Sequence, residues 1–374
     1  MKLRKAVLCL ALCAITALTF LPTMASAATV ASGSCGENLT WKLDDAGTLT
    51  ISGTGAMTDF IFSGDVPWED HWDKIAQFVF PAGITFIDPE VFSWSDIDGY
   101  WVDAANQHYS SDSCGVLFNK DKTTLIAAPG NLYGSYALPE TVETIEELAF
   151  SDSNLSEILL PDSLEVIGER AFANCHNLDE IVVPYRVYSI GTSAFSTGGL
   201  GGFIRVDEDN LNFSNDSNGV LFNKDKTILL QAPSGLTGSY TVPGTVKIID
   251  AYSFSGLLHM TEVIIPESVT RIEEYAFFFC YRLAVIRGCK GLRTVGEAAI
   301  SSCDALTDVY YDGTMNQAMG IQFGPRNDSL ANATFHFRST VPGDMDGDGD
   351  KDTDDAVYLL LNVMFGDEDY PLAQ

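Results

Sequence analysis

Three consecutive repeats set the fold of this chain. They read Pro139-Glu-Thr-Val-Glu-Thr-Ile-Glu-Glu-Leu-Ala-Phe150, Pro161-Asp-Ser-Leu-Glu-Val-Ile-Gly-Glu-Arg-Ala-Phe172 and Pro184-Tyr-Arg-Val-Tyr-Ser-Ile-Gly-Thr-Ser-Ala-Phe195. Each repeat has an aliphatic residue three and six positions after its proline, and an Ala-Phe pair at the tenth and eleventh positions. The prolines are 22 and 23 residues apart. A fixed period of this size is typical of a solenoid, in which similar coils stack on one another.

The same pattern returns four times outside this stretch, which makes seven repeats. Three of the four begin at Pro81, Pro243 and Pro266, and the last begins at Cys289, which stands in the place of a proline. One repeat of this length cannot bury its own apolar edge, whereas stacked repeats share a continuous core. The sequence therefore predicts coils of about 23 residues.

Each coil is expected to contain a strand directly before its proline. Short apolar runs occupy this place at 158–160, 181–183 and 263–265. Strands of adjacent coils would pair about 4.8 Å apart. Proline ends the strand because it has no N–H to donate to the ladder. The aliphatic residues after the proline are then predicted to turn inward, and the Ala-Phe pair to fill the far side of the coil.

This repeat, with its strand before proline, its Ile-Gly and its Ala-Phe-x-x-Cys, resembles the BspA-like leucine-rich repeat family over roughly residues 30–337. The resemblance implies a β-rich leucine-rich-repeat solenoid with short helical turns. It implies a scaffold that presents a recognition surface, and it does not identify a ligand.

The N-terminal residues 1–27 are predicted to be a secretory signal peptide. They combine three basic residues near the start, an apolar run over 6–20 and the small-residue cleavage site Ala25-Ser26-Ala27. The apolar run is short for a membrane span. We therefore expect an extracellular protein, secreted or at the cell surface, without a membrane span after cleavage; a bacterial origin is what the dockerin resemblance of the C-terminal segment, described below, implies.

Residues 28–74 are predicted to form an N-terminal cap that covers the open edge of the first coil. Four tryptophans follow one another closely at the end of this segment and just after it: Trp68, Trp72, Trp94 and Trp101. They are interpreted as a cap core, because each ring buries a large area. A platform that stacks on sugar rings is the alternative, and it makes a glycan a possible partner.

The solenoid itself is predicted over residues 75–308, with a C-terminal cap at 309–338. Two longer modules, 101–135 and 203–239, interrupt its coils and share the sequence Gly-Val-Leu-Phe-Asn-Lys-Asp-Lys. Each module is predicted to contain two strands around an Asn-Lys-Asp-Lys turn. Such hairpins either protrude as a partner-binding surface or add edge strands that cover a coil.

Residues 339–374 are predicted to be a calcium-binding module. Calcium takes six to eight oxygen ligands, and an EF-hand-type loop places them at positions 1, 3, 5, 7, 9 and 12. Glycine at position 6, here Gly349, allows the sharp turn. The predicted Ca²⁺ ligands are Asp344, Asp346, Asp348, Asp350 (through its carbonyl), Asp352 and Asp355.

Because an apolar run, 356–365, follows the loop, the segment resembles one repeat of a dockerin module. The resemblance implies calcium-dependent docking to a cohesin in an extracellular, polysaccharide-degrading complex. A full dockerin has two such repeats, whereas one is present before Gln374. Position 12 is aspartate where the EF-hand has glutamate, and Lys351 stands where an apolar residue is usual.

Three cysteines recur fourteen residues after the first position of a repeat: Cys175, Cys280 and Cys303. The repeat explains them as small buried residues of the core. Cys280 and Cys303 lie in neighbouring coils, where a disulfide is within reach, and export would permit one. They are interpreted as thiols.

The charge and the histidine content of the chain argue against several classes of partner and site. The formal net charge of −30 argues against nucleic acid and anionic membranes as partners. The five histidines show no metal-binding spacing, and no Gly-x-Ser-x-Gly motif is present. The main hypothesis is a secreted, non-catalytic binding or adhesion protein whose partner is a cohesin or another extracellular protein. The alternatives are a glycan-degrading enzyme component of such a complex and a structural cell-surface protein.

Overall fold

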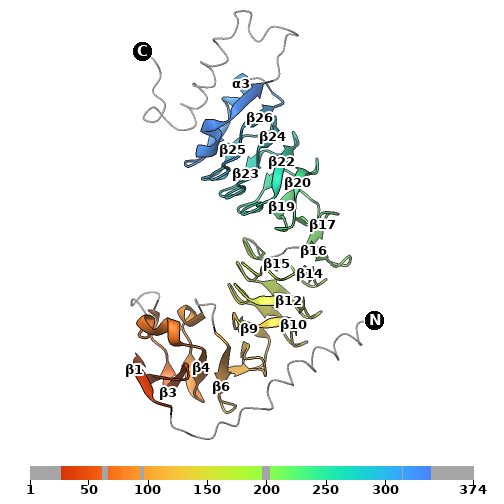
Figure 1. The fold of residues 1–374 in the computed structure, drawn as a ribbon. Helices are drawn as coiled ribbons and strands as arrows, with labels where there is room; N and C mark the ends of the chain where they lie inside the picture. The colour runs from red at the N-terminus through yellow and green to blue at the C-terminus, as the bar shows by residue number, and fades with distance from the viewer. Residues whose placement is uncertain (1–26, 61–65, 93–96, 196–202, 314, 338–374) are drawn as a thin grey trace, which may run out of the picture. The chain divides into compact units, whose positions relative to one another are not determined.

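The computed structural model describes residues 27–60, 66–92, 97–195, 203–313 and 315–337. The chain divides into two compact units, Met1–Ala194 and Phe195–Gln374. Both consist of short strands stacked coil upon coil (Figure 1). The predicted β-solenoid is therefore confirmed. The signal peptide and the calcium module lie outside the described residues, and the domain boundaries given above remain predictions.

The N-terminal unit begins with an antiparallel sheet that continues into parallel coils. Strands β1, β2 and β3 pair antiparallel, whereas β4 pairs parallel with β3, and β6 pairs parallel with β4. Strand β5 pairs with the end of β3. The elements are β1 (Thr29–Gly36), β2 (Leu39–Asp44), β3 (Thr48–Ala56), η1 (Glu69–Lys74), β4 (Gln77–Phe80), β5 (Gly83–Phe86), η2 (Pro89–Phe92) and β6 (Gly99–Val102).

The rest of this unit contains the first hairpin module and the three repeats that set the fold. Strands β7, β8 and β9 pair antiparallel, and β9 then starts a parallel ladder with β11, β13 and β15. Strand β10 pairs parallel with β12. The bounds are β7 (Tyr109–Ser111), β8 (Leu117–Asn119), β9 (Thr124–Ala127), β10 (Tyr133–Ala137), β11 (Thr144–Ile145), β12 (Asn154–Leu159), β13 (Val166–Ile167), β14 (Glu180–Val183) and β15 (Ser189–Ile190).

The C-terminal unit repeats this plan. Its hairpin module is the antiparallel set β17, β18 and β19, which leads into the parallel ladder β21, β23, β25 and β27. The bounds are β16 (Phe203–Val206), β17 (Phe213–Asn215), β18 (Leu221–Asn223), β19 (Ile228–Gln231), β21 (Ile248–Ile249), β23 (Arg271–Ile272), β25 (Thr294–Val295) and β27 (Gln322–Phe323). In both units the module therefore supplies the edge strand on which the parallel coils build.

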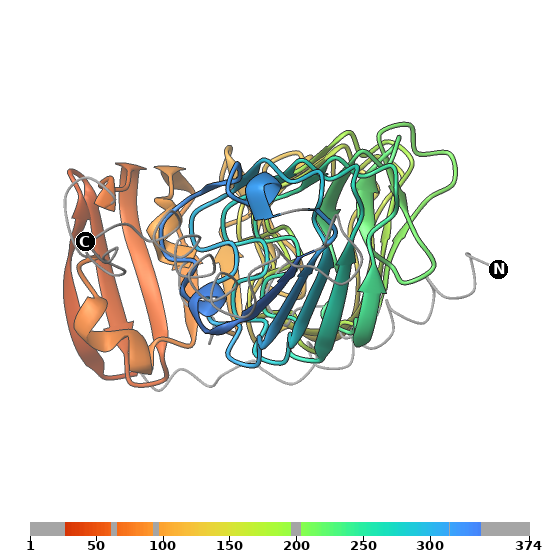
Figure 2. The ribbon, with the colours of Figure 1, turned by 90° about the horizontal axis from the view of Figure 1, so that it is seen from above.

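A second, five-stranded parallel sheet covers another side of the C-terminal unit, and Figure 2 shows its strands side by side in green to blue. It consists of β20 (Gly238–Thr241), β22 (Met260–Ile265), β24 (Val285–Gly288), β26 (Asp308–Tyr311) and β28 (Thr334–Phe337). The last coil also contains two short helical turns, α3 (Met315–Ala318) and η3 (Asp328–Asn332). The residues predicted as a C-terminal cap thus include strands that continue both sheets of this unit.

Each coil contains two strands where the sequence predicted one. The strand before the proline is present, as β22 before Pro266 shows. The aliphatic residue six positions after the proline, expected to lie in an inward turn, belongs to a second short strand, such as Ile272 in β23. That residue still faces the core, so the second strand adds an inter-coil ladder without changing the burial pattern.

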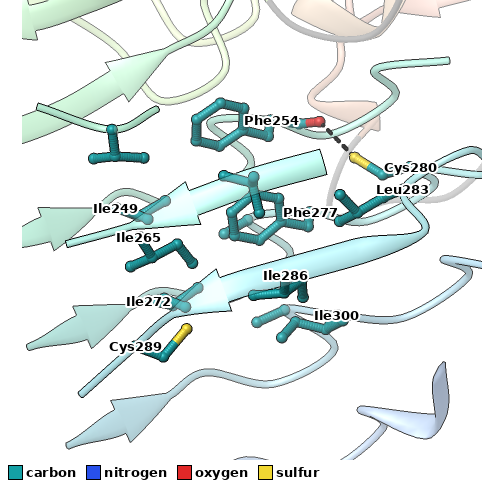
Figure 3. Close-up of a cluster of buried hydrophobic side chains, with 14 of the residues drawn as sticks. Ile249, Phe254, Ile265, Ile272, Phe277, Cys280, Leu283, Ile286, Cys289 and Ile300 are labelled. Atoms are coloured by element: carbon teal, nitrogen blue, oxygen red, sulfur yellow. Dashed lines mark hydrogen bonds between the residues drawn. The ribbon is translucent and has the colours of Figure 1, made fainter. Parts of the chain in front are cut away.

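The core of the C-terminal unit is a column of repeated side chains (Figure 3). The rings of Phe254 and Phe277 stack 4.8 Å apart at 8°. Ile249 and Ile272 lie opposite each other in adjacent coils. The Ala-Phe pairs therefore fill the coils, as predicted from the period.

The segment around the Ala-Phe pair has a backbone feature that the sequence did not indicate. The ninth residue after the first position of a repeat has a positive φ, between 49° and 59°, in six repeats: Leu148, Arg170, Ser193, Tyr252, Tyr275 and Ala298. These turns aim N–H groups at the next coil, so that Phe172 N donates to Ala194 O over 2.8 Å and Phe277 N donates to Ala299 O over 2.8 Å. A third backbone ladder thus joins adjacent coils.

Candidate binding face

The five-stranded sheet of the C-terminal unit has one buried and one outward surface, because successive side chains of a strand point to opposite sides. The inner row is Tyr240, Val263, Ile286, Val309 and Phe335, all of them buried. The two outward rows are Ser239, Glu262, Val285, Asp308 and Thr334, and Thr241, Ile264, Arg287, Tyr310 and His336. We call these ten outward residues the sheet face.

Three side chains of the sheet face stack across neighbouring strands. The Cζ atom of Arg287 lies 4.0 Å from the centre of the Tyr310 ring. The Tyr310 ring in turn stacks on His336, with 4.3 Å between the ring centres and 11° between the planes. In-register parallel pairing brings the three residues together, although 49 positions of sequence separate the first from the last. The result is a preorganised row of planar groups.

Two carboxylates hold the ends of this row in place. Arg287 Nε lies 2.6 Å from Glu262 Oε1, and His336 Nε2 lies 2.8 Å from Asp308 Oδ1. The hydrogen bond from Arg287 lowers the pKa of Glu262, and the hydrogen bond with His336 lowers the pKa of Asp308. Both contacts are partly exposed to solvent, so they orient the planar groups more than they stabilise the fold.

This arrangement suits recognition. Arginine and tyrosine are enriched among the residues that dominate binding energy at protein interfaces. Here their planes are fixed before a partner arrives, which reduces the entropy lost on binding. Ser239, Thr241 and Thr334 add hydroxyl groups around the stack. The sheet face can therefore bind a partner by stacking and hydrogen bonding.

The predicted metal site cannot be placed on this framework. Its ligands are Asp344, Asp346, Asp348, Asp350, Asp352 and Asp355, and all of them lie outside the described residues. Within the described ranges no cluster of three His, Cys, Asp or Glu side chains has the geometry to hold a metal ion. The calcium site remains a prediction.

The tryptophans near the N-terminus differ in burial and in the contacts that they make. Trp68 is fully buried and meets Trp41 edge to face, with 5.9 Å between the ring centres. Trp72 is half-buried beside it, and Trp101 donates a hydrogen bond from Nε1 to Gln77 Oε1 over 2.9 Å. Trp94 lies outside the described residues. The core interpretation is confirmed for Trp68, whose buried ring cannot stack on a sugar.

The repeated cysteines are thiols with a specific contact. Cys175 donates from Sγ to Phe150 O over 3.1 Å, and Cys280 donates to Phe254 O over 3.1 Å (Figure 3). Cys303 donates to Phe277 O over 3.2 Å. All six described cysteines are free thiols. Hydrogen bonding with Cys303, together with burial, raises the pKa of Cys280. The thiol interpretation, rather than the disulfide, therefore holds for Cys280 and Cys303.

Comparison with known proteins supports the same reading of the fold. Residues 133–216 and 235–336 match the BspA type leucine rich repeat region in six copies. These two stretches of the chain are therefore similar to BspA-type leucine-rich repeats. No curated protein sequence matches the chain significantly. No helix in the described ranges is long and apolar enough to cross a membrane.

Solved structures to which the chain is similar include a leucine-rich repeat protein from Eubacterium ventriosum, with 25% identity over 76% of this chain and 73% of that one and a TM-score of 0.52. The pneumococcal vaccine antigen PcpA shows 18% identity over 84% of this chain and 89% of that one, with a TM-score of 0.48. A leucine rich cell surface protein from Faecalibacterium prausnitzii shows 18% identity over 79% and 98%, with a TM-score of 0.41.

The sheet face was missed at the level of sequence although a signal was present. Arg287 follows Pro266, the first position of its repeat, by 21 residues, and Tyr310 follows Cys289, the first position of the next repeat, by the same distance. An alignment of the repeats on their first positions would therefore have put the two residues in one row. What the spacing alone does not give is the exposure of the row and the direction of each side chain.

Proposed function

We propose that this chain is a secreted or cell-surface, non-catalytic binding protein that recognises an extracellular protein through the sheet face. The observation that carries the proposal is the partly exposed stack of Arg287, Tyr310 and His336 on a parallel sheet, held by contacts with two carboxylates. The BspA-type repeat supports it, because stacked coils present a continuous surface to partners. The predicted signal peptide supports export.

The test compares two variants of the purified protein as bait for extracellular proteins of the producing bacterium and of its surroundings. The double variant Arg287→Ala, Tyr310→Ala removes the stack and leaves the inner row of the sheet intact. The matched control Leu211→Ala removes a side chain of the same unit that is 80% exposed and lies outside the sheet face. We expect the control to capture the same partner as the unaltered protein and the double variant to lose it. Equal capture by both would exclude the sheet face as the site.

We propose in addition that residues 339–374 attach the protein to an extracellular complex through a calcium-loaded, dockerin-like contact with a cohesin. The support is the spacing of the six aspartates, which meets the ligand positions of a calcium loop. Their mutual repulsion favours a bound cation, and helix formation in 356–365 would accompany binding. The family match ends at residue 336, before this segment.

Calorimetry and circular dichroism of the full chain with added Ca²⁺ test this tail. We expect one ion to bind with a gain of helix, and the variant Asp344→Ala, Asp346→Ala to bind none. A cohesin pull-down with and without chelator then tests docking itself. If calcium addition produced no heat, the proposal for residues 339–374 would be wrong, whereas the proposal for the sheet face would be unaffected. A screen for glycan hydrolysis, which we expect to be negative, tests the enzyme alternative.

A further inference from the structure

A second surface of the C-terminal unit carries a cluster of aromatic side chains that the sheet face does not include. The cluster runs over two adjacent coils, and we call it the aromatic stripe: Tyr252, Tyr275, Phe278, Phe279 and Tyr281. Tyr252 and Tyr275 stack 4.9 Å apart at 10° across the two coils. Phe279 and Tyr281 stack at 5.5 Å and 27°, and they are 38% and 43% exposed. Planar apolar surface therefore faces solvent at the end of the stripe.

The backbone at Phe279 indicates that packing does not explain this ring. Phe279 stands thirteen residues after Pro266, where the coil again requires the left-handed region, and its φ is 61°. Other repeats fill the same position with residues that adopt this conformation readily or are small: Asp152, Asn174, Gly256 and Ser302. A bulky aromatic is an outlier there. A strained residue that also exposes a large ring is a candidate for function.

A polar pocket of about 300 Å³ lies in the following coil, directly beside the end of the stripe. The two coils are adjacent at this point, because Phe279 N donates to Ser301 O over 3.3 Å. The pocket is lined by Ser301, Ser302, Cys303, Asp304, Leu306, Asp328, Ser329 and Asn332. Asp304, Asp328 and Asn332 are exposed and bond no other side chain of the described part of the chain. Their acceptors and donors are thus open to a ligand.

An exposed ring pair beside a pocket of carboxylates, an amide and hydroxyls matches the chemistry of a sugar. A pyranose ring has an apolar C–H face that packs on an aromatic ring, and hydroxyls that both donate and accept hydrogen bonds at its edge. Two carboxylates in the pocket and a net charge of −30 disfavour an acidic sugar. A volume of 300 Å³ is at the lower end for ligand pockets, enough for a sugar residue or two.

We infer that the aromatic stripe and the polar pocket beside it form a binding site for a neutral oligosaccharide. One sugar ring packs on Phe279 and Tyr281, and the next enters the pocket, where Asp304 and Asp328 accept hydrogen bonds from its hydroxyls. This site goes beyond the protein-binding function proposed above and uses none of the residues of the sheet face. The chain would then contact a glycan and a protein through separate surfaces.

The test is isothermal titration calorimetry of the full chain with cellohexaose, xylohexaose and mannohexaose as probes. Phe279→Asn removes the ring and installs the residue that another repeat uses at the same backbone position, Asn174, so its fold should be retained. Tyr281→Ala and Asp304→Ala remove the second ring and a pocket carboxylate. The matched control is Phe203→Ser, which removes an aromatic ring of the same unit that is 50% exposed.

We expect at least one hexasaccharide to bind, and each of the three site variants to weaken it at least about tenfold. Phe203→Ser and the double variant Arg287→Ala, Tyr310→Ala should bind it like the unaltered protein. Thermal unfolding of Phe279→Asn checks that its fold is intact. The inference would be overturned if none of the three hexasaccharides bound, or if Phe279→Asn bound a hexasaccharide as well as the unaltered protein does. It would also be overturned if the unaltered protein bound no saccharide and Phe279→Asn lost the captured protein partner, because the stripe would then be a protein contact.

Discussion

Replacing Phe172 by alanine should remove a large part of the stability of the N-terminal unit. The Phe172 ring is fully buried and stacks on Phe150, with 5.1 Å between the ring centres and 5° between the planes. Truncation of a buried phenylalanine costs about 3–5 kcal/mol, through lost transfer free energy and the cavity that remains. Of this, about 0.5–1.5 kcal/mol is the stacking contribution of the ring pair.

The structure places the expected loss near the upper end of that range. The cost of a cavity falls when the surroundings can collapse into it. Here Phe172 N donates to Ala194 O, and Phe150 N donates to Ala171 O, each over 2.8 Å. These bonds fix the backbone on both sides of the ring, so little collapse is possible. We therefore expect a loss of roughly 4–5 kcal/mol.

Urea denaturation followed by circular dichroism measures this loss as a shift of the midpoint at constant slope. Hydrogen exchange should place the loosened amides in the coils that touch Phe172, because each coil contacts only its neighbours. Tyr188→Ala, which removes a ring that is 57% exposed in the same unit, is the control and should stay within about 0.5 kcal/mol. A change that small for Phe172→Ala would refute the assignment of the Ala-Phe pairs to the core.

Three further outcomes follow from contacts described above or from close backbone approaches. Gly191→Ala should cost about 1–3 kcal/mol in urea denaturation, because a Cβ there would lie 2.4 Å from a backbone nitrogen of the preceding coil; unchanged stability would mean that the coils are less tightly stacked. Cys280→Ser keeps a donor to the Phe254 carbonyl and should therefore be less destabilising than Cys280→Val. The reverse order would show that the thiol makes no stabilising hydrogen bond to this carbonyl. The depressed pKa of Asp308 contributes stability above its ordinary value of 3.8 that is lost as the pH falls through the lower folded value; His336→Gln should return the carboxyl titration seen by NMR toward 3.8, and no movement would exclude the pairing.

The sequence was most informative where one residue type recurs at one position. The prolines and the Ala-Phe pairs identified the coils, the buried rings and the strand before each proline, because periodic apolar residues have to share one core. The buried thiols followed from the same period. These features depend on burial alone, and burial is what a hydrophobic pattern reports.

Features set by backbone conformation or by contacts between coils were not predictable in this way. The left-handed residues, which include Leu148, Arg170 and Tyr275, share no side-chain type, since their conformation is imposed by hydrogen bonds to the next coil. The stack on the sheet face depends on register, and the aromatic stripe depends on which rings remain exposed. Tyr275-Ala-Phe-Phe-Phe-Cys-Tyr281 is conspicuous in the sequence, but only the structure separates the buried Phe277 from the exposed Phe279.

The contacts of the repeated thiols make this fold sensitive to oxidation at sulfur. Each S–H donates to a phenylalanine carbonyl in the preceding coil, as Cys175, Cys280 and Cys303 do. Oxidation to a sulfenic acid would force an extra oxygen into a closed core, and a disulfide would take two thiols from their carbonyls at once. The described coils hold together with reduced sulfur and need no oxidant to mature.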